Sequence, residues 1–189
     1  MFPEPHFKKV DGDFYDSSLN TNTFSNNFPL NFDWRDKINF SKVQHQGDIC
    51  GACWAFSAMS AVESQYAIKN RSENLVFSKQ EIIDCSENSL DKAYRNHGCH
   101  YGYDTDAYVY VIKEGVIEEK YYPYTGTVDE TCMRNKFSGK RYKLDDYKLT
   151  SFNQTDESII RLLIEKGPLT VNVLALDEQF RHYKYCSKL

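Results

Sequence analysis

One stretch of the chain repeats apolar side chains at three- and four-residue steps. It is the run CWAFSAMSAVESQYAIKN, which begins at Cys53. This spacing puts the apolar residues on one stripe and predicts a helix of about 17 residues. Cys53 is therefore expected at the N-terminus of that helix. The stripe consists of Ala55, Ala58, Met59, Val62 and Tyr66.

A second helix is predicted after Phe77. Ser78 and Glu81 have the spacing of a capping box, in which each side chain bonds the other residue's backbone amide. Phe77 and Ile82 are placed to staple across this box. The helix is expected to run to about Cys85.

Two more helices and a strand are predicted further along the chain. A third helix covers 105–114 and ends at a glycine, and a fourth covers 156–166 between Thr155 as N-cap and a Gly-Pro pair. The run PLTVNVLAL, residues 168–176, reads as a strand. The tyrosine- and glycine-rich stretch 115–154 reads as loops and short strands. Residues 1 to about 30 have no helical or alternating period and read as a poorly ordered leader.

Composition excludes two classes of function. The 189 residues include 23 basic and 27 acidic side chains, for a net charge of -4, and no basic run favours binding to nucleic acid. No apolar run approaches the roughly 18 residues of a membrane span. We therefore expect a protein that binds neither nucleic acid nor membrane. Six cysteines and the sequons at Asn39, Asn70 and Asn153 are compatible with the secretory pathway, where disulfides persist.

The position of Cys53 favours nucleophilic chemistry. The thiolate is the attacking form of cysteine, and the unpaired amides of a helix N-terminus stabilise it. Attack on a carbonyl also builds negative charge on the substrate oxygen, which needs amide donors about 3 Å away. Gln46 and the backbone amide of Cys53 are the candidate donors.

These residues resemble a known family. Gln46-Gly47 followed by Cys-Gly-Ala-Cys-Trp-Ala-Phe-Ser, residues 50–57, looks like the active-site segment of papain-like cysteine peptidases, the cathepsin family. The similarity covers about residues 28–186, and it continues through the motifs at 32–35, 63–65, 78–85, 98–99, 121–124 and 167–168. Among these peptidases, the viral cathepsins of insect baculoviruses look most similar.

The resemblance implies an α+β fold with two lobes and a substrate cleft between them. Residues 1–28 would be the tail of an inhibitory propeptide, 29–140 a helical lobe that contains the nucleophile helix, and 141–189 an incomplete strand-rich lobe. The implied activity is hydrolysis of peptide bonds through a thioester acyl-enzyme, after removal of the propeptide and without a cofactor or metal. The implied partners are polypeptide substrates and cystatin-like or propeptide inhibitors. A monomer in the secretory pathway, a lysosome-like compartment, the extracellular space or a viral or host-cell vacuole is expected.

Two departures from the family pattern affect the site. Gln46 precedes Cys53 by seven positions where the family usually has six, because Asp48-Ile49 holds one residue too many. Tyr101-Gly102 stands where the family has a glycine pair that binds extended substrates. The remaining matches to substrate-binding positions, in the main specificity pocket, are Tyr103, Asp104 and Asn172. The alternative for all of them is an ordinary solvated loop or strand residue.

The resemblance also implies a cysteine pairing and an incomplete chain. Cys50 would pair with Cys99 and Cys85 with Cys132, leaving Cys53 free. Cys186 would have no partner, because its partner in the family lies beyond the catalytic histidine. The family's histidine and asparagine follow the nucleophile by about 130–150 residues. His182 precedes Cys186, whereas the family's histidine follows that cysteine, so the resemblance implies that this base and the asparagine lie after Leu189. The 189 residues alone are therefore expected to be inactive.

Other interpretations remain open at this point. The chain could be a truncated homologue that binds peptides or a partner without catalysis, or a disulfide-rich structural protein in which Cys53 is inert. His97 and His100 flank Cys99 and could indicate a zinc site, but loop histidines beside a disulfide are usually solvated. His45 is expected at the surface near the cleft, and His6 in the leader.

Overall fold

The computed structural model describes residues 28–70, 74–86, 95–127, 131–150 and 155–173. All four predicted α-helices are confirmed, with bounds within about two residues of those expected. None of the described helices is long and apolar enough to cross a membrane. The described elements, in chain order, are η1 Trp34–Asp36, α1 Cys53–Lys69, α2 Lys79–Cys85, α3 Asp104–Lys113, η2 Arg134–Lys136 and α4 Asp156–Lys166.

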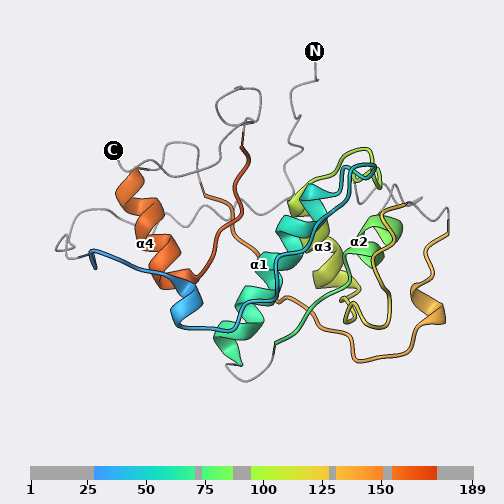
Figure 1. Ribbon diagram of the computed structural model, residues 1–189, viewed down its shortest axis with the longest axis horizontal. Helices are drawn as coiled ribbons and strands as arrows, with labels where there is room; N and C mark the ends of the chain where they lie inside the picture. The colour runs from blue at the N-terminus through green and yellow to red at the C-terminus, as the bar shows by residue number, and fades with distance from the viewer. Residues whose placement is uncertain (1–27, 71–73, 87–94, 128–130, 151–154, 174–189) are drawn as a thin grey trace, which may run out of the picture.

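Helix α1 is the centre of the described structure. It packs against both α2 and α3, while α4 lies apart from this group (Figure 1). The predicted stripe of α1 faces the core: Ala55, Ala58 and Met59 are fully buried. Phe77 and Ile82 join the same core cluster from the start of α2. Burial of these apolar side chains is the main contribution that holds the three helices together.

The predicted capping box is only half formed. Ser78 Oγ accepts a hydrogen bond of 2.9 Å from the Glu81 amide, as expected for an N-cap. The return bond is absent, because the Ser78 amide donates to the Ile117 carbonyl instead. The carboxylate of Glu81 is fully buried and accepts from Tyr110 Oη at 3.0 Å, from the Ile117 amide at 3.0 Å and from Arg141. The core therefore uses the carboxylate that was expected to cap the helix.

A second buried charge joins α1 to α2. Lys79 is fully buried, and its Nζ lies 2.8 Å from Glu63 Oε1 and 3.3 Å from Glu119 Oε2. Glu63 also accepts from Ser41 Oγ at 2.5 Å and from the Phe77 amide at 2.8 Å. The hydrogen bonds around this pair offset the cost of removing the charges from water.

Helix α4 has the predicted caps and is bonded to α1. Thr155 Oγ1 accepts from the Ser158 amide, and Gly167 ends the helix with φ at 113°, a left-handed conformation that favours glycine. Gln65 of α1 donates from Nε2 to the Lys166 carbonyl at 2.7 Å. This bond fixes the position of the end of α4 against the nucleophile helix.

The predicted strand over 168–176 is not present in its described part. Residues 168–173 form no strand, and the described β contacts are single antiparallel bridges such as that between Val116 and Tyr142. Val171 and Val173 are exposed, so their apolar side chains are not covered by a neighbour in the described ranges. Residues 174–176 lie outside the described residues, so only that part of the strand stays a prediction.

Candidate active site

The candidate nucleophile occupies the first turn of α1. Cys53 is the first residue of the helix, and its thiol is exposed and not disulfide-bonded. No side chain caps this helix, because Ala52 occupies the N-cap position. The Ala55 amide donates to the Ala52 carbonyl at 2.9 Å, so the amides of Cys53 and Trp54 are the ones available to stabilise negative charge on the sulfur or on an oxygen bound beside it.

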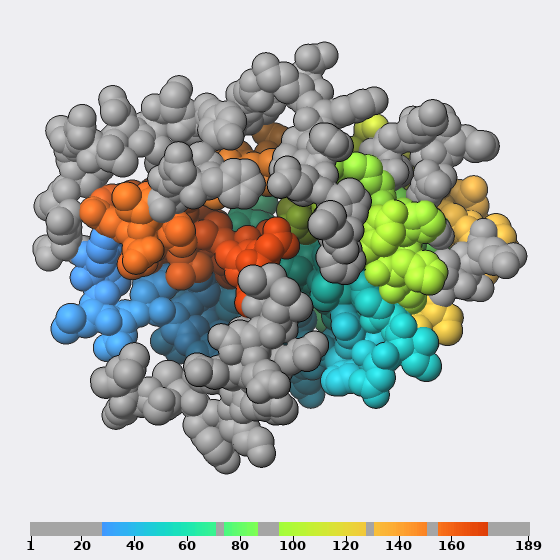
Figure 2. Space-filling view, turned by 90° about the horizontal axis from the view of Figure 1, so that it is seen from above, coloured from blue at the N-terminus to red at the C-terminus, as the bar shows by residue number. Residues whose placement is uncertain are grey.

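Residues 98–102, here called the 99 loop, are held against the residues that precede α1. The disulfide Cys50–Cys99 joins the two segments. The Gly51 amide donates to the Cys99 carbonyl at 2.8 Å, and Trp54 Nε1 donates to the Gly98 carbonyl at 3.3 Å. Figure 2 shows the two segments side by side, the 99 loop in light green and the residues before α1 in cyan. The 99 loop therefore forms one wall beside Cys53.

Gly102 lies directly against the tryptophan that follows Cys53. A Cβ atom on Gly102 would come within 2.3 Å of Trp54 Cε2 and 2.4 Å of Cδ2. The indole is itself buried. Gly102 therefore has a packing role beside its predicted contact with substrate, because only a residue without a side chain fits against this ring.

Tyr101 extends into solvent from the 99 loop. Its side chain is 55% exposed, and its ring centroid lies 5.2 Å from that of His97. The His97 amide donates to the Tyr101 carbonyl at 2.8 Å, which closes the loop. The rings of His97 and His100 are 6.3 Å apart, and the described residues contain no group of three or more side chains suited to hold a metal.

The predicted specificity residues Tyr103 and Asp104 lie at the start of α3. Asn96 Oδ1 accepts from the Tyr103 amide at 2.8 Å, and the guanidinium of Arg95 lies 4.4 Å from the centre of the Tyr103 ring. The carboxylate of Asp104 accepts from Thr170 Oγ1 at 2.9 Å. This bond brings the chain after α4 to the start of α3.

Asn172 follows Thr170 by two residues and is exposed. Thr170 also accepts a hydrogen bond of 3.3 Å from Tyr108 Oη, and burial raises the pKa of Tyr108 to about 12. The segment that contains Asn172 is thus joined to α3 through Asp104 and Tyr108. The Asn172 side chain forms no hydrogen bond with the other described residues.

Gln46 lies before the nucleophile in a half-buried position. The extra residue of Asp48-Ile49 is accommodated in an exposed turn, in which Gly47 has φ at 84° and Ile49 is 92% exposed. The Gln46 carbonyl accepts a hydrogen bond of 2.6 Å from Tyr124 Oη. The seven-residue spacing therefore forms an outward bulge between two fixed points, Gln46 and Cys50.

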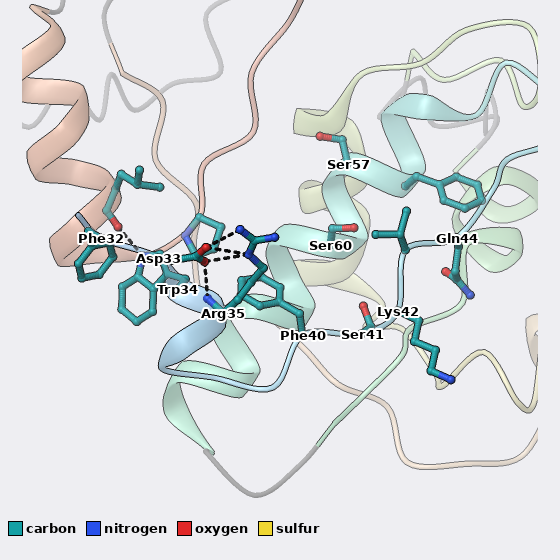
Figure 3. A pocket seen from close by; sticks show the side chains of 14 residues that line it. Phe32, Asp33, Trp34, Arg35, Phe40, Ser41, Lys42, Gln44, Ser57 and Ser60 are labelled. Atoms are coloured by element: carbon teal, nitrogen blue, oxygen red, sulfur yellow. Dashed lines mark hydrogen bonds and ion pairs between the residues drawn. The ribbon is translucent and has the colours of Figure 1, made fainter. Parts of the chain in front are cut away.

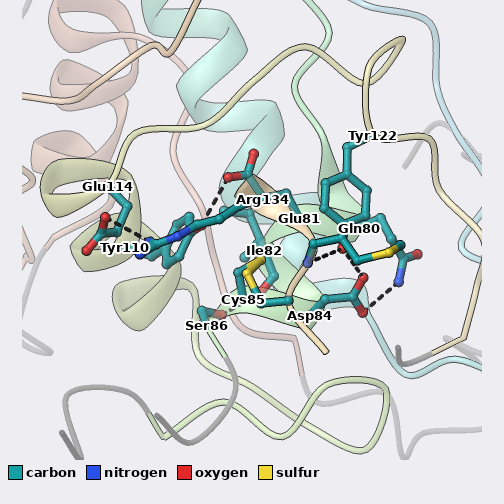
Figure 4. Close-up of a disulfide and its surroundings, with 12 residues drawn as sticks. Gln80, Glu81, Ile82, Asp84, Cys85, Ser86, Tyr110, Glu114, Tyr122 and Arg134 are labelled. Carbon is teal, nitrogen blue, oxygen red and sulfur yellow. Dashed lines mark hydrogen bonds and ion pairs between the residues drawn. A yellow bond between two sulfur atoms is a disulfide. The ribbon is translucent and has the colours of Figure 1, made fainter. Parts of the chain in front are cut away.

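The second predicted disulfide pair is also bonded. Cys85 at the end of α2 joins Cys132 (Figure 4). The four cysteines thus have the pairing that the resemblance implies, and Cys53 is the free cysteine of the described residues. Cys186 and His182 lie outside the described residues, as do His6 and the predicted propeptide tail.

A hollow of about 830 Å³ lies between the N-terminal segment, α1 and the end of α4. Its walls include Phe40 and Trp34 from the N-terminal segment, and Ser57 and Ser60 face it from α1 (Figure 3). Trp34 Nε1 donates to the Leu163 carbonyl at 2.7 Å and so connects this segment to α4. Neither Cys53 nor Gln46 lines the hollow, although Gln44 and Phe56 do.

Sequence reasoning missed two residues that organise the site. Asn96 is fully buried and bonds both Ser86 Oγ and the Tyr103 amide, although an asparagine before a glycine-containing loop reads as solvated. Tyr124 is distinguished in the sequence only as part of the family motif at 121–124. The signal for both is a long-range hydrogen bond, which a single sequence does not display.

Comparison with known proteins gives one consistent result. The family model described as "Papain family cysteine protease" matches residues 28–187. A cysteine protease from Blomia tropicalis is 34% identical over 166 residues, which is 85% of this chain and 47% of that protein. Cathepsin S from Mus musculus is 37% identical over 157 residues, 82% of this chain and 44% of that protein. The chain spans less than half the length of these relatives.

Solved structures agree with the sequence matches. A structure from work on antibody cross-reactivity between the mite allergens Blo t 1 and Der p 1 matches with a TM-score of 0.69 at 35% identity, covering 76% of this chain and 45% of the other. A cysteine protease from Carica candamarcensis in complex with E-64 matches with a TM-score of 0.62 at 34% identity, covering 72% and 60%. The chain therefore belongs to the papain family of cysteine proteases.

Proposed function

We propose that this protein is a cysteine endopeptidase of the papain type, with Cys53 as its nucleophile. The observation that carries the proposal is the placement of a free, exposed thiol at the first residue of α1, beside a loop fixed by disulfide and hydrogen bonds. The other cysteines of the described residues are in disulfides, so the thiol of Cys53 is available for chemistry.

The proposed reaction begins with attack of the Cys53 thiolate on the carbonyl carbon of a peptide bond. A C–S bond forms, and the carbonyl oxygen becomes an oxyanion that accepts hydrogen bonds from the Cys53 amide and the Gln46 side chain. The C–N bond then breaks, and the leaving amine takes a proton from a protonated histidine. Water attacks the thioester and releases the acid product and the thiol.

The histidine of this mechanism lies outside the described residues. His182 is one candidate, and the resemblance implies instead a histidine that follows Leu189. We also propose that the protein divides into two lobes at about residue 140. The residues proposed to contact the substrate are Gly102, Tyr101, Tyr103, Asp104 and Asn172.

Polypeptides are the proposed substrates, and peptide-like or propeptide inhibitors are the proposed regulators. The Carica candamarcensis relative binds E-64. Cystatin-like proteins belong to the same class of expected inhibitors, and the protein is proposed to act as a monomer. The two disulfides fit an oxidising compartment, for which we propose a lysosome-like or extracellular location.

The first experiment measures thiol labelling of the 189-residue chain with iodoacetamide or an epoxide probe from pH 4 to 9. Cys53→Ala should abolish the fast labelling, and Cys186→Ala, the matched control, should retain it. Fast labelling that persists in Cys53→Ala would overturn the proposal.

Hydrolysis of fluorogenic peptides by the same samples separates catalysis from binding. Turnover that is lost in His182→Ala would identify His182 as the base, and turnover that this change leaves intact would exclude it. Peptide binding with labelling but no turnover is expected both of a peptidase whose histidine is not among the 189 residues and of a homologue that binds peptides without cleaving them.

A further inference from the structure

The geometry points to a role for Tyr124 that rests on the proposed function: we propose that Tyr124 is a positioning residue for the oxyanion donor Gln46. Its hydroxyl donates to the Gln46 carbonyl at 2.6 Å. Its ring packs edge-on against Phe56, with centroids 4.9 Å apart and planes at 88°. Phe56 is the third residue after Cys53 on α1, so Tyr124 connects the nucleophile helix to the backbone of Gln46.

The position of Tyr124 is itself fixed by α2. On one side of it, the Tyr122 carbonyl accepts a hydrogen bond of 2.6 Å from Ser78 Oγ. On the other side, the Thr125 amide donates to Gln80 Oε1 at 2.9 Å. Figure 4 shows Gln80 extending from α2 beside Tyr122. Tyr124 therefore stands on a turn that a buried helix holds at both ends, which makes it a rigid support.

The segment around Gln46 has few other fixed points. Val43 is fully exposed and Ile49 is 92% exposed, so their side chains anchor nothing. Gln44 Nε2 bonds Glu119 Oε1 at 2.8 Å, but this bond lies two residues before Gln46. The Gly47 amide donates to His45 Nδ1 at 2.9 Å, a local and exposed bond that spans Gln46 without joining it to the core. After Gln46 the chain enters the exposed bulge that holds the extra residue. Among the described residues, the hydrogen bond from the Tyr124 hydroxyl is the one that is made to Gln46 itself.

A donor for an oxyanion must be held near its working position before the reaction. Displacement of about 1 Å is enough to reduce a rate by about 10²-fold. A segment lengthened by one residue has more freedom at its donor than the shorter family segment. The Tyr124 hydroxyl restrains this freedom at the backbone of Gln46, and this restraint is how the longer segment retains a usable donor.

The test uses Tyr124→Phe, which removes the hydroxyl and keeps the ring against Phe56. The matched control is Tyr66→Phe, because Tyr66 Oη also donates to a backbone carbonyl, that of Lys143, at 2.6 Å. Both tyrosines are partly buried and packed edge-on against a phenylalanine. The two variants therefore lose the same kind of bond, at the site in one and away from it in the other.

Two reagents separate a positioning effect from a loss of structure. A peptide aldehyde adds to Cys53 as a thiohemiacetal: a C–S bond forms, the thiol proton moves to the carbonyl oxygen, and that oxygen occupies the oxyanion site. Iodoacetamide alkylates the same sulfur by displacing iodide and builds no oxyanion. Tyr124→Phe should weaken aldehyde binding about fivefold and leave the iodoacetamide rate unchanged. Tyr66→Phe should change neither.

A double variant tests the route of the effect. In a Gln46→Ala background the donor side chain is gone, so Tyr124→Phe should weaken aldehyde binding no further. Equal aldehyde affinity for the Tyr124→Phe and Tyr66→Phe variants, or an undiminished effect of Tyr124→Phe without Gln46, would overturn this proposal alone. Failure of both reagents to modify Cys53 in the unaltered chain would overturn the proposed function and this inference with it.

Discussion

Substitution of Gly102 by alanine gives a sharp test of the packing beside Cys53. A Cβ atom at this position would lie 2.3, 2.4 and 2.7 Å from three atoms of the Trp54 indole. Carbon atoms in contact are normally about 3.5–4.0 Å apart, so the overlap exceeds about 1 Å. The φ angle of Gly102 is not in the left-handed region, and an alanine backbone is therefore tolerated there. The cost comes from the steric contact alone.

The indole cannot move away easily. Trp54 is buried, its Nε1 is bonded to the Gly98 carbonyl, and the adjacent segment is closed by the Cys50–Cys99 disulfide. Overpacking of a well-packed site usually costs about 1–3 kcal/mol. Because both walls of this contact are constrained, we expect Gly102→Ala to lower the free energy of unfolding by about 3 kcal/mol, the upper end of that range.

Urea denaturation followed by tryptophan fluorescence and far-ultraviolet circular dichroism measures this change. Gly139→Ala is the matched control, since its Cβ would lie 3.2 Å from the ring of Tyr121, which is 40% exposed and free to shift. We expect less than about 0.5 kcal/mol there. If Gly102→Ala unfolds at the same urea concentration as the Gly139→Ala control, the indole does not lie against Gly102 and the reasoning is refuted.

Three further predictions follow from buried groups and caps. Lys79→Met should destabilise the protein by about 3–5 kcal/mol in urea denaturation, because it leaves the buried carboxylate of Glu63 without its cation, whereas Lys120→Met at an exposed ion pair should cost less than about 1 kcal/mol. Thr155→Ala should cost about 1 kcal/mol and reduce helical circular dichroism, since it removes the N-cap of α4. Burial raises the pKa of Tyr108 from 10 to about 12, so the folded state holds this proton more tightly than the unfolded state. The resulting stability is fully present below about pH 10 and is lost as the pH rises toward about 12; Tyr108→Phe should make the loss of urea resistance over that range shallower.

The helices could be predicted because their signals are local. Apolar residues at helical spacing define α1, and Thr155 with Gly167 defines both ends of α4. These signals come from backbone geometry and from the bonds that end a helix, which need no information about distant residues. The same holds for the placement of Cys53 at the start of α1.

The partners of polar side chains could not be predicted in the same way. Ser78 and Glu81 have the sequence of a capping box, but Glu81 bonds groups from residues 110, 117 and 141. A core partner that is distant in sequence competes with the local bond, and the choice depends on the packing of the whole domain. The hydrogen bond from Tyr124 to Gln46 likewise joins two residues that are 78 positions apart in the sequence, so it could not be predicted either.

Gly102 shows how a family pattern and a structure can assign different roles to one residue. The resemblance predicts that its backbone polar groups bond the backbone of an extended substrate. In the structure its missing side chain makes room for Trp54. The two roles are compatible, since one concerns the backbone polar groups and the other the Cα. A variant at this position therefore needs a stability measurement before any loss of activity is assigned to substrate binding.

Helix α2 fixes several neighbouring segments through its buried side chains, which are mostly polar. Six of its seven residues are buried, among them Lys79, Gln80, Glu81 and Asp84. Each of these four bonds a group outside the helix, and Asp84 accepts from Tyr122 Oη at 2.7 Å. A buried polar group is costly unless it meets a specific partner, so such bonds fix a neighbouring segment more uniquely than apolar contacts do. The helix therefore fixes where residues 117–125 lie, and the hydrogen bond from Tyr124 extends this constraint to the backbone of Gln46.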